Sequence, residues 1–421
     1  GSLEGGKAMP RQLIPDVDDD RPFLIGGGET WTYGQLRSRV EAMSADERER
    51  PLEACRIVDL RWEMDRLARL LACFTAGRDV SLCGPVEAAA RASFRGRGFG
   101  PLLLLRSGGT TGTPRTVVHA QRRFLADYRP RASEPLRELI LYAPDHVAGL
   151  DALLRGLSRG VTLVRPESAT PAAIAEALEA HRVEVLPATP SFLQFLLLSG
   201  ELAGRDLSSV HHIPHGAEPM PGGVRAAVKA RFPKACLHHR FGLTETGALP
   251  VETDPEQPEV LRLPDGGGRG YAWKVIDGEL WVRSPRRMLG TLEHGLLDGD
   301  DLWYRTGDRA EQVPGGGVRV LGRESAQINV GGEKVQPEEV EAWLLEVEGI
   351  RDVEVRGAPH SLTGQTVVAR VVLEQGANVA DLRSRVRKAA RAAARPLVQM
   401  PTKFEPVDAI ERTDTGKRKR G

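Results

Sequence analysis

The chain has 421 residues, an ordinary hydrophobic content of 41% and a formal net charge of +1. This length favours two or more domains, and the near-zero charge excludes a global attraction to nucleic acid or to a membrane surface. Its four cysteines show no Cys-x-x-Cys spacing, which argues against zinc and disulfide frameworks, and no apolar run is long enough to span a bilayer. We therefore expect a cytoplasmic protein without a nucleic-acid partner or a membrane span.

Apolar runs typical of strands alternate with helical patterns up to about residue 321. Strands are expected at 102–105, 139–142, 161–164 and 183–186, and helices at 150–157 and 171–181. Such alternation predicts an α/β fold whose mostly parallel sheets are flanked by helices. From about residue 266 the pattern changes to turn-rich strands. Asp277-Gly278 favours a hairpin, so we expect a small antiparallel β unit to complete a large domain of residues 1–321.

A second, small α+β domain is expected at residues 322–421. Pro337 opens a helix there, because proline suits the first helical turn. Strands follow at 353–355 and 366–373. The arginine-rich pattern at 379–394 is typical of an amphipathic helix with a solvated face rather than a binding face.

The strand at 102–105 opens into a loop built almost wholly from glycine and hydroxyl residues. Glycine lets backbone N–H groups approach an anion closely, and serine and threonine add short side-chain donors. The loop is therefore a candidate phosphate cradle, although the Gly-Lys-Ser/Thr of the P-loop is absent. The alternative is an ordinary flexible surface loop. The candidate residues are Ser107, Gly108, Gly109, Thr110, Thr111, Gly112 and Thr113, with Arg115 just after them.

Four further segments follow in order along the chain: Phe241–Gly247, Tyr304–Asp308, Gly322–Glu341 and Arg412–Lys417. With the loop, they resemble the adenylate-forming superfamily of acyl-CoA synthetases, adenylation domains and luciferases, and the loop is most similar to that of aryl-acid-activating members. The resemblance implies ATP-dependent activation of a carboxylic acid, Mg²⁺ as a cofactor, and a mobile C-terminal lid. The loop comes earlier than in relatives, which implies an abbreviated first lobe.

The resemblance also implies a role for each motif residue that binds the nucleotide. The loop and Arg115 would hold the β- and γ-phosphates, Thr244 would contact the α-phosphate, and Glu245 would ligate Mg²⁺. Phe241 would stack on adenine, with Gly216, Ala217 and Glu218 lining the other face. Asp308 would bind the ribose hydroxyls, and Arg323 would assist at the domain junction. Lys417 would bridge the attacking carboxylate and the α-phosphate.

Four positions depart from the family pattern. Arg115 replaces a lysine and Thr116 a glycine in the loop, which keeps the positive charge. Ser325 stands where relatives carry an Asp or Lys at the hinge, and Glu411 replaces a proline. Ser325 at the hinge affects the expected rotation of the small domain. The acyl-transfer step that follows adenylate formation depends on that rotation.

The segment at 144–150 resembles the one that flanks the acyl pocket, where His146 would act as a gate and touch the substrate carboxylate. Relatives that activate amino acids carry an Asp at the next position, whereas this chain has Val147. An ammonium there would be buried without a partner. The resemblance therefore favours an aryl or medium-length acid over an α-amino acid.

Three functions stay open at this point. The first is an acid–thiol ligase that transfers the acyl group to coenzyme A, which the stretch Gly331–Lys334 favours. The second is a stand-alone adenylating enzyme that loads an acyl carrier protein or another nucleophile. The third is a degenerate paralogue that only binds ligand, against which the presence of Thr244, Glu245, Asp308 and Lys417 argues.

Overall fold

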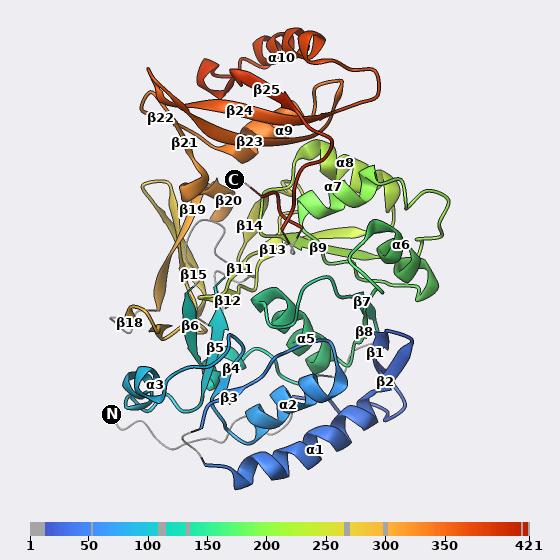
Figure 1. The fold of residues 1–421 in the computed structure, drawn as a ribbon, viewed down its shortest axis with the longest axis vertical. Coiled ribbons are helices and arrows are strands. Elements are labelled where there is room, and N and C mark those ends of the chain that lie inside the picture. The colour runs from blue at the N-terminus through green and yellow to red at the C-terminus, as the bar shows by residue number, and fades with distance from the viewer. Residues whose placement is uncertain are drawn as a thin grey trace.

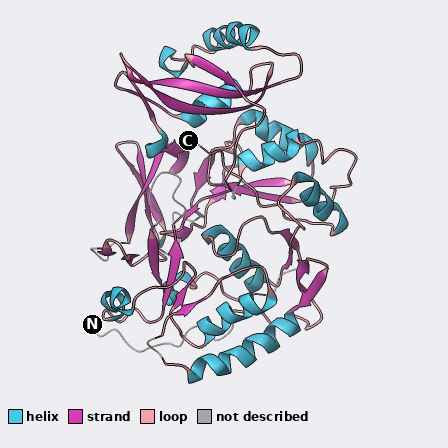
Figure 2. Cartoon of the chain, viewed as in Figure 1, coloured by secondary structure: helices cyan, strands magenta, loops and turns pink. Residues whose placement is uncertain are grey.

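The computed structural model describes residues 13–51, 54–107, 115–131, 135–264, 270–297, 302–413 and 416–419. Figure 1 shows a large body of helices and strands, and a smaller unit above it that is formed by the last part of the chain. Helices and strands alternate through the large body, whereas strands dominate its junction with the small unit (Figure 2). This is the α/β organisation that the sequence predicts.

The first sheet of the large body is six-stranded and mixed, in the order β18-β17-β6-β5-β4-β3. Its first three strands along the chain run parallel, and the rest pair antiparallel. The predicted strand at 102–105 is confirmed, and all four of its leucines are fully buried. The strands are β3 (Arg56–Ile57), β4 (Val80–Ser81), β5 (Leu102–Arg106), β6 (Thr116–Ala120), β17 (Gly290–Thr291) and β18 (Gly295–Leu296).

The second sheet is mostly parallel. It has the order β2-β1-β8-β7, and isolated parallel bridges through Val185 connect it to β9 and β10. The expected strand at 183–186 is thus reduced to one bridged residue, Val185, which pairs with Glu138 and with His212. Pro187 and Pro214 lack the N–H that a longer ladder needs. The strands are β1 (Pro22–Gly26), β2 (Glu29–Thr32), β7 (Arg137–Leu139), β8 (Thr162–Val164), β9 (His212–Gly216) and β10 (Cys236–Arg240).

The helices of the large body start at side-chain caps where the sequence supplies them. Thr32 forms a capping box with Gln35, and Thr170 and Thr189 each cap a helix that begins with proline. The helices are α1 (Tyr33–Glu49), α2 (Met64–Thr75), α3 (Ala88–Arg95), α4 (Gln121–Phe124), α5 (Val147–Arg159), α6 (Pro171–Ala180), α7 (Pro190–Leu198) and α8 (Gly222–Arg231).

A six-stranded antiparallel sheet closes the large body, in the order β13-β14-β20-β19-β16-β15. The predicted hairpin is confirmed: Asp277 and Gly278, both with positive φ, connect β15 to β16. The strands are β13 (Glu252–Thr253), β14 (Val260–Arg262), β15 (Ala272–Ile276), β16 (Glu279–Arg283), β19 (Trp303–Val313) and β20 (Gly317–Arg323), and the short pair β11 (Gly242–Leu243) and β12 (Gly247–Ala248) lies nearby.

The small unit has its own sheet and core. Its strands pair in the order β22-β21-β24-β23, with β25 beside β24, and α9 and α10 bury apolar residues against them. The predicted boundary after residue 321 lies inside β20 and stays a prediction. The elements are η3 (Glu324–Ala326), β21 (Ile328–Val330), β22 (Glu333–Val335), α9 (Pro337–Leu344), β23 (Ile350–His360), β24 (Gly364–Leu373), α10 (Val379–Ala392), η4 (Leu397–Gln399) and β25 (Lys403–Pro406).

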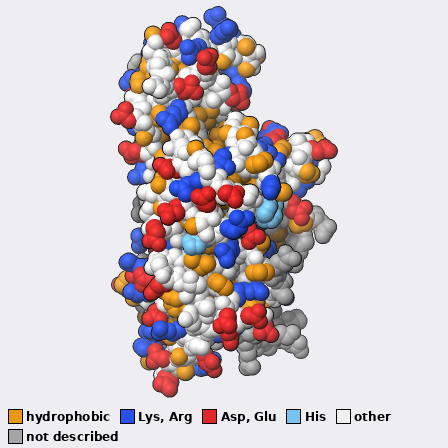
Figure 3. All heavy atoms as spheres, turned by 90° about the vertical axis from the view of Figure 1, so that its right-hand side faces the viewer, with side chains coloured by type: hydrophobic (Ala, Val, Ile, Leu, Met, Phe, Trp, Pro, Cys, Tyr) orange, Lys and Arg blue, Asp and Glu red, His pale blue; other side chains and the backbone are white. Residues whose placement is uncertain are grey.

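Acidic and basic side chains alternate over the face shown in Figure 3, in keeping with the small net charge. None of the described helices is long and apolar enough to cross a membrane.

Candidate active site

The candidate phosphate loop connects the antiparallel strands β5 and β6. Gly108, Gly109, Thr110, Thr111, Gly112 and Thr113 lie outside the described residues. At the base of the loop, the N–H of Ser107 donates to the carbonyl of Arg115 at 2.9 Å, and the N–H of Arg115 donates to Ser107 Oγ at 3.0 Å. Ser107 and Arg115 therefore hold the two ends of the loop together.

Thr244 and Glu245 stand in the tight connection between β11 and β12. The carbonyl of Thr244 accepts from Nε2 of His119 at 2.7 Å, which places the ring hydrogen on that nitrogen. Burial lowers the pKa of His119 to about 4, so its ring is neutral. The carbonyl of Glu245 accepts from the N–H of Met288 at 2.7 Å. These bonds fix the backbone of the connection and leave the Glu245 carboxylate to other partners.

Asp308 lies at the start of the long pairing of β19 with β20 and is only 6% exposed. Arg323 Nε lies 3.1 Å from its Oδ1 and donates through Nη1 to the carbonyl of Thr306 at 2.8 Å. Burial raises the pKa of Asp308 to about 6, and the charges of Arg323 and Lys417 oppose that shift. Three residues predicted from the sequence therefore interact around one buried carboxylate: Asp308, Arg323 and Lys417.

Tyr304 interacts with several of the predicted site residues, although the sequence analysis assigned it no role. Burial and the negative charge of Glu245 raise the pKa of its hydroxyl, and the charges of Arg115 and Arg323 oppose that rise. Its position in the motif Tyr304–Asp308 was the available signal. The ring thus connects the predicted metal ligand to the predicted phosphate and ribose residues.

His146 lies at the N-terminus of α5, where its Nδ1 accepts from the N–H of Ala148 at 3.2 Å. Burial lowers the pKa of His146, and the nearby charge of Lys417 lowers it further. Lys417, from the end of the chain, therefore acts electrostatically on both His146 and Asp308. These two residues come from different elements of the large body.

The segment Gly216-Ala217-Glu218 begins at the last residue of β9, which pairs with the last residue of β10. A Cβ on Gly216 would lie 2.4 Å from the carbonyl oxygen of Arg240, so only glycine fits, and Ala217 has a φ of 71°. Glu218 Oε1 accepts from the N–H of Ser191 at 2.7 Å, in the first turn of α7. The structure thus gives Glu218 a helix-capping contact that the sequence did not suggest.

Phe241 follows β10 directly and is half-buried, with its ring packed on the core of the antiparallel sheet. Its carbonyl accepts from the N–H of Leu249 at 2.9 Å. Phe241 and the Gly216 segment therefore lie at the adjacent ends of two parallel strands, which is where open α/β sheets place ligands.

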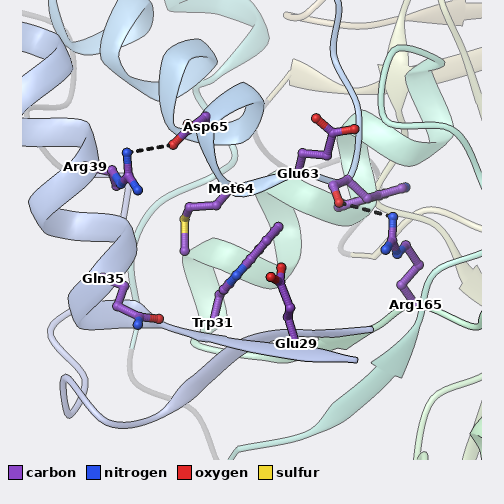
Figure 4. Close-up of a pocket in the computed structure, with 9 residues that line it drawn as sticks. Glu29, Trp31, Gln35, Arg39, Glu63, Met64, Asp65 and Arg165 are labelled. Atoms are coloured by element: carbon purple, nitrogen blue, oxygen red, sulfur yellow. Dashed lines mark hydrogen bonds and ion pairs between the residues drawn. The ribbon is translucent and has the colours of Figure 1, made fainter. Parts of the chain in front are cut away.

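A cavity of about 550 Å³ lies elsewhere, among β2, α1 and the start of α2. Trp31, Met64 and the ion pair of Arg39 with Asp65 surround it, and Arg165 donates to a backbone carbonyl at its rim (Figure 4). None of its lining residues belongs to the predicted site. The described residues also contain no group of three or more His, Cys, Asp or Glu that could hold a metal ion.

Two family models match this chain. Residues 100–291 match the AMP-binding enzyme family, and residues 339–417 match the AMP-binding enzyme C-terminal domain. The chain belongs to the AMP-binding enzyme family. The first stretch contains Thr244 and Glu245 and the second ends at Lys417, whereas Asp308 and Arg323 lie between them.

The curated relatives that match are larger proteins. The chain is 29% identical over 307 residues to 4-coumarate–CoA ligase-like 2 of Arabidopsis thaliana, which covers 66% of this chain and 53% of that protein. It is 28% identical over 379 residues to 2-hydroxy-7-methoxy-5-methyl-1-naphthoate–CoA ligase of Streptomyces carzinostaticus, which covers 80% of this chain and 65% of the relative. The matched part of the chain thus spans between about half and two thirds of the length of these relatives.

Solved structures share the whole fold. The anthranilate CoA ligase AuaEII, in complex with anthranoyl-AMP, superposes with a TM-score of 0.76 at 16% identity, over 95% of this chain and 93% of that one. The amide bond synthetase McbA from Marinactinospora thermotolerans gives 0.73 at 22% identity, over 94% and 95%. The predicted fold class, a large α/β domain with a small C-terminal domain, is therefore confirmed.

Proposed function

We propose that this protein uses ATP to activate a carboxylic acid as an acyl-adenylate, with release of pyrophosphate, and then transfers the acyl group to the thiol of coenzyme A. One observation carries the proposal. The charge of Lys417 acts on His146, the predicted acyl-pocket gate, and on Asp308, the predicted ribose ligand. A lysine whose charge acts on both groups is suited to bridge a carboxylate and the α-phosphate.

In the first step, a carboxylate oxygen attacks the α-phosphorus and the bond to pyrophosphate breaks. Negative charge then gathers on the α-phosphate, and Lys417 and Thr244 would stabilise it, because fixed donors act strongly in a site that excludes water. Asp308 and Arg323 would orient the nucleotide through the ribose. Catalysis of this kind is mainly positioning and electrostatics.

The donor set fits ATP with Mg²⁺. Glu245 is a carboxylate that interacts with the hydroxyl of Tyr304, and the charges of Arg115 and Arg323 act on the same hydroxyl. Mg²⁺ is commonly held by one or two carboxylates plus substrate phosphates, so a single protein ligand, Glu245, suffices. When bound, the ion neutralises charge on the phosphates. The Ser107–Thr113 loop and Arg115 would hold the β- and γ-phosphates.

We propose an aryl or medium-length acid rather than an α-amino acid as substrate. Val147 packs against the core of the first lobe and offers no carboxylate to an ammonium. The neutral ring of His146, one residue earlier, suits a place beside the substrate carboxylate. The relatives include a 4-coumarate–CoA ligase-like protein and a naphthoate–CoA ligase, which supports an aryl acid.

In the second step, the thiol sulfur attacks the acyl carbonyl, the bond to phosphate breaks, and AMP leaves. CoA is the proposed acceptor because the curated relatives carry the name CoA ligase; an acyl carrier protein or another nucleophile is the alternative. Residues 322–421 would move as a lid between the steps on the large domain of 1–321. We place the reaction in the cytoplasm.

A panel of acids tests the proposal. Pyrophosphate release should appear with benzoate-like or medium-chain acids and ATP, and CoA should convert the adenylate to a thioester and AMP. Pyrophosphate release without CoA consumption would assign the acceptor to a carrier protein or another nucleophile. Binding of ATP and acid without any pyrophosphate release would overturn the proposal in favour of a ligand-binding paralogue.

A further inference from the structure

The end of the chain returns from the small unit to the large body. Figure 1 shows it descending beside α7. Arg412 and Arg418 form an antiparallel bridge, the N–H of Thr413 donates to the carbonyl of Lys417 at 2.7 Å, and the N–H of Lys419 donates to the carbonyl of Glu411 at 2.9 Å. These bonds hold Lys417 within a paired segment of the chain.

Gly416 presses this segment against α7. Its φ is +79°, and a Cβ there would lie 2.6 Å from the Cβ of Phe192. Only glycine gives this backbone both its left-handed conformation and this close approach. The residue just before Lys417 is therefore in contact with the large body.

Arg418, the residue just after Lys417, is 8% exposed and bonds to both bodies. From α7, Ser191 Oγ and Gln194 Oε1 accept its hydrogen bonds at 3.0 and 2.7 Å. From the small unit, Asp352 Oδ1 lies 3.2 Å and Glu341 Oε2 3.6 Å away. A buried guanidinium thus fastens the two bodies together next to the predicted catalytic lysine.

Among the described residues, the ion pairs of Arg418 are with the small unit, while the charge of Glu218 in the large body also favours its charged form. Asp352 also accepts from Arg412 at 2.6 Å, so two arginines face two carboxylates within the small unit. The acceptors on α7 are uncharged. Leaving α7 would cost these hydrogen bonds and the attraction to Glu218. Arg418 would keep its ion pairs with Asp352 and Glu341, so its own charge would not be left unpaired. The contact can therefore form and break as the small unit moves.

The two acceptors on α7 also have other partners, Ser191 within the large body and Gln194 in β23 of the small unit. The N–H of Ser191 donates to Glu218 of the predicted adenine segment at 2.7 Å, and Gln194 Nε2 donates to the carbonyl of Arg351 at 3.4 Å. Arg418 thereby connects the end of the chain to the first turn of a helix tied to the candidate nucleotide site.

We propose that Arg418 is a positioning residue that holds Lys417 in the site for adenylate formation by docking on Ser191 and Gln194 of α7. This inference rests on the proposed function. Arg418 does not itself contact the reacting atoms. Arg418 instead keeps the neighbouring Lys417 in position, because a small displacement of a catalytic group lowers the reaction rate strongly.

The first test compares Arg418→Ala with Lys419→Ala. Both remove one positive charge from adjacent positions of the tail, but Lys419 is exposed. Arg418→Ala should lower kcat of acid-dependent ATP–pyrophosphate exchange by roughly 10- to 100-fold, the range that a misplacement of about 1 Å produces. Its KM for ATP should change little, Arg418→Lys should restore part of kcat, and Lys419→Ala should match the wild type.

A second variant tests the same contact in case Arg418→Ala does not fold. Gln194→Ala removes an acceptor on α7 while leaving Asp352 and Glu341 beside the guanidinium, so no buried charge loses its partner. It should lower kcat in the same direction by a smaller factor. Normal exchange in a folded Gln194→Ala and a folded Arg418→Ala would overturn the proposal.

Amide hydrogen exchange of the full-length protein supplies a readout independent of activity. Peptides covering residues 411–419 and α7 should exchange faster in Arg418→Ala and Gln194→Ala than in Lys419→Ala and the wild type. Equal exchange in all four proteins would overturn the docking contact. If the wild type activates no acid, the proposed function fails, and the hydrogen-exchange comparison still decides whether Arg418 docks the tail.

Discussion

At the scale of single residues, charge and burial decide what the candidate site can do. The structure assembles residues from distant parts of the sequence around a half-buried tyrosine, Tyr304. It also sets the protonation of the two groups that flank Lys417: burial raises the pKa of Asp308 and lowers that of His146. At neutral pH the first is therefore a carboxylate and the second a neutral ring.

Lys417→Ala should reduce acid-dependent ATP–pyrophosphate exchange by roughly 10²–10³-fold, as loss of one fixed transition-state contact does. ATP binding should persist, because the loop, Thr244 and Asp308 stay in place. Exchange assays and calorimetric titration with ATP measure the two effects. A variant with wild-type exchange would remove Lys417 from the mechanism.

Nucleotide binding should weaken as the pH falls through about 6, because the pKa of Asp308 is about 6 and only its ionised form offers two acceptors to the ribose hydroxyls. Asp308→Ala should bind ATP and AMP more weakly to a similar degree, since both carry the ribose, and it should lose the pH dependence. If Asp308→Ala impaired ATP binding alone, Asp308 would act on phosphates or metal instead.

Val147→Asp should lower activity on the native acid, because it places a charge beside an apolar lobe. The wild type should activate an aryl or aliphatic acid far better than the matching α-amino acid, by tenfold for about each 1.4 kcal/mol of difference. Exchange rates for benzoate-like, fatty and α-amino acids under one condition provide the comparison. A preference for an α-amino acid would contradict the pocket assignment while leaving the adenylation chemistry intact.

At the scale of elements, buried ion pairs attach helices to the sheets. Asp79, next to β4, is fully buried and accepts from Arg91 at 2.6 Å and Arg95 at 2.8 Å, both on α3. Its other oxygen accepts from the N–H of Leu102 at 2.9 Å, at the start of β5. One carboxylate thereby joins a helix to the strand that leads into the candidate phosphate loop.

Asp79→Asn should destabilise the fold by about 3–5 kcal/mol, because it removes the buried carboxylate that lies 2.6 Å from the guanidinium of Arg91. Asp46→Asn is the matched control, since Asp46 lies on the exposed face of α1 and pairs with Arg50 just after the helix, with Arg69 at 3.6 Å. That pair should contribute less than about 1 kcal/mol. Urea unfolding of the two variants measures the difference. Equal, small effects would show that α3 docks without this ion pair.

Sequence patterns predicted the elements best where the signal was local. The hairpin at Asp277-Gly278 and the helix that starts at Pro171 follow from residues that determine their own backbone conformation. The strand expected at 183–186 was wrong in extent, because its pairing depends on neighbours that are distant in sequence and include Pro214. The strand expected at 139–142 is β7, which begins and ends earlier than expected, at Arg137–Leu139.

At the scale of the whole molecule, buried neutral histidines make stability depend on pH. Burial lowers the pKa of His119 to about 4, of His239 to about 4 and of His215 to about 2. In the unfolded chain each would titrate near its ordinary value of about 6.5. Between pH 6.5 and 4 the unfolded state therefore binds more protons, and stability falls as the pH falls.

The free energy of unfolding should decrease by up to about 1.4 kcal/mol per pH unit for each such histidine below pH 6.5. Asp308, whose pKa is raised, offsets part of this loss. His119→Gln keeps a donor for the carbonyl of Thr244. In this variant the free energy of unfolding should fall less between pH 7 and pH 5, by about the contribution of one histidine. Denaturant unfolding at several pH values measures it, and an unchanged slope would contradict a neutral buried His119.

The sequence by itself determined the α/β class, the family resemblance and the identity of the motif residues, because glycine, proline and charged residues at fixed spacings constrain their own surroundings. Only the tertiary structure decided which of these residues meet. Lys417, at the end of the chain, reaches His146 and Asp308 because Gly416 and Arg418 dock on α7. Those contacts join residues more than two hundred positions apart, and no local pattern encodes them, since they depend on how two separately packed cores fit together.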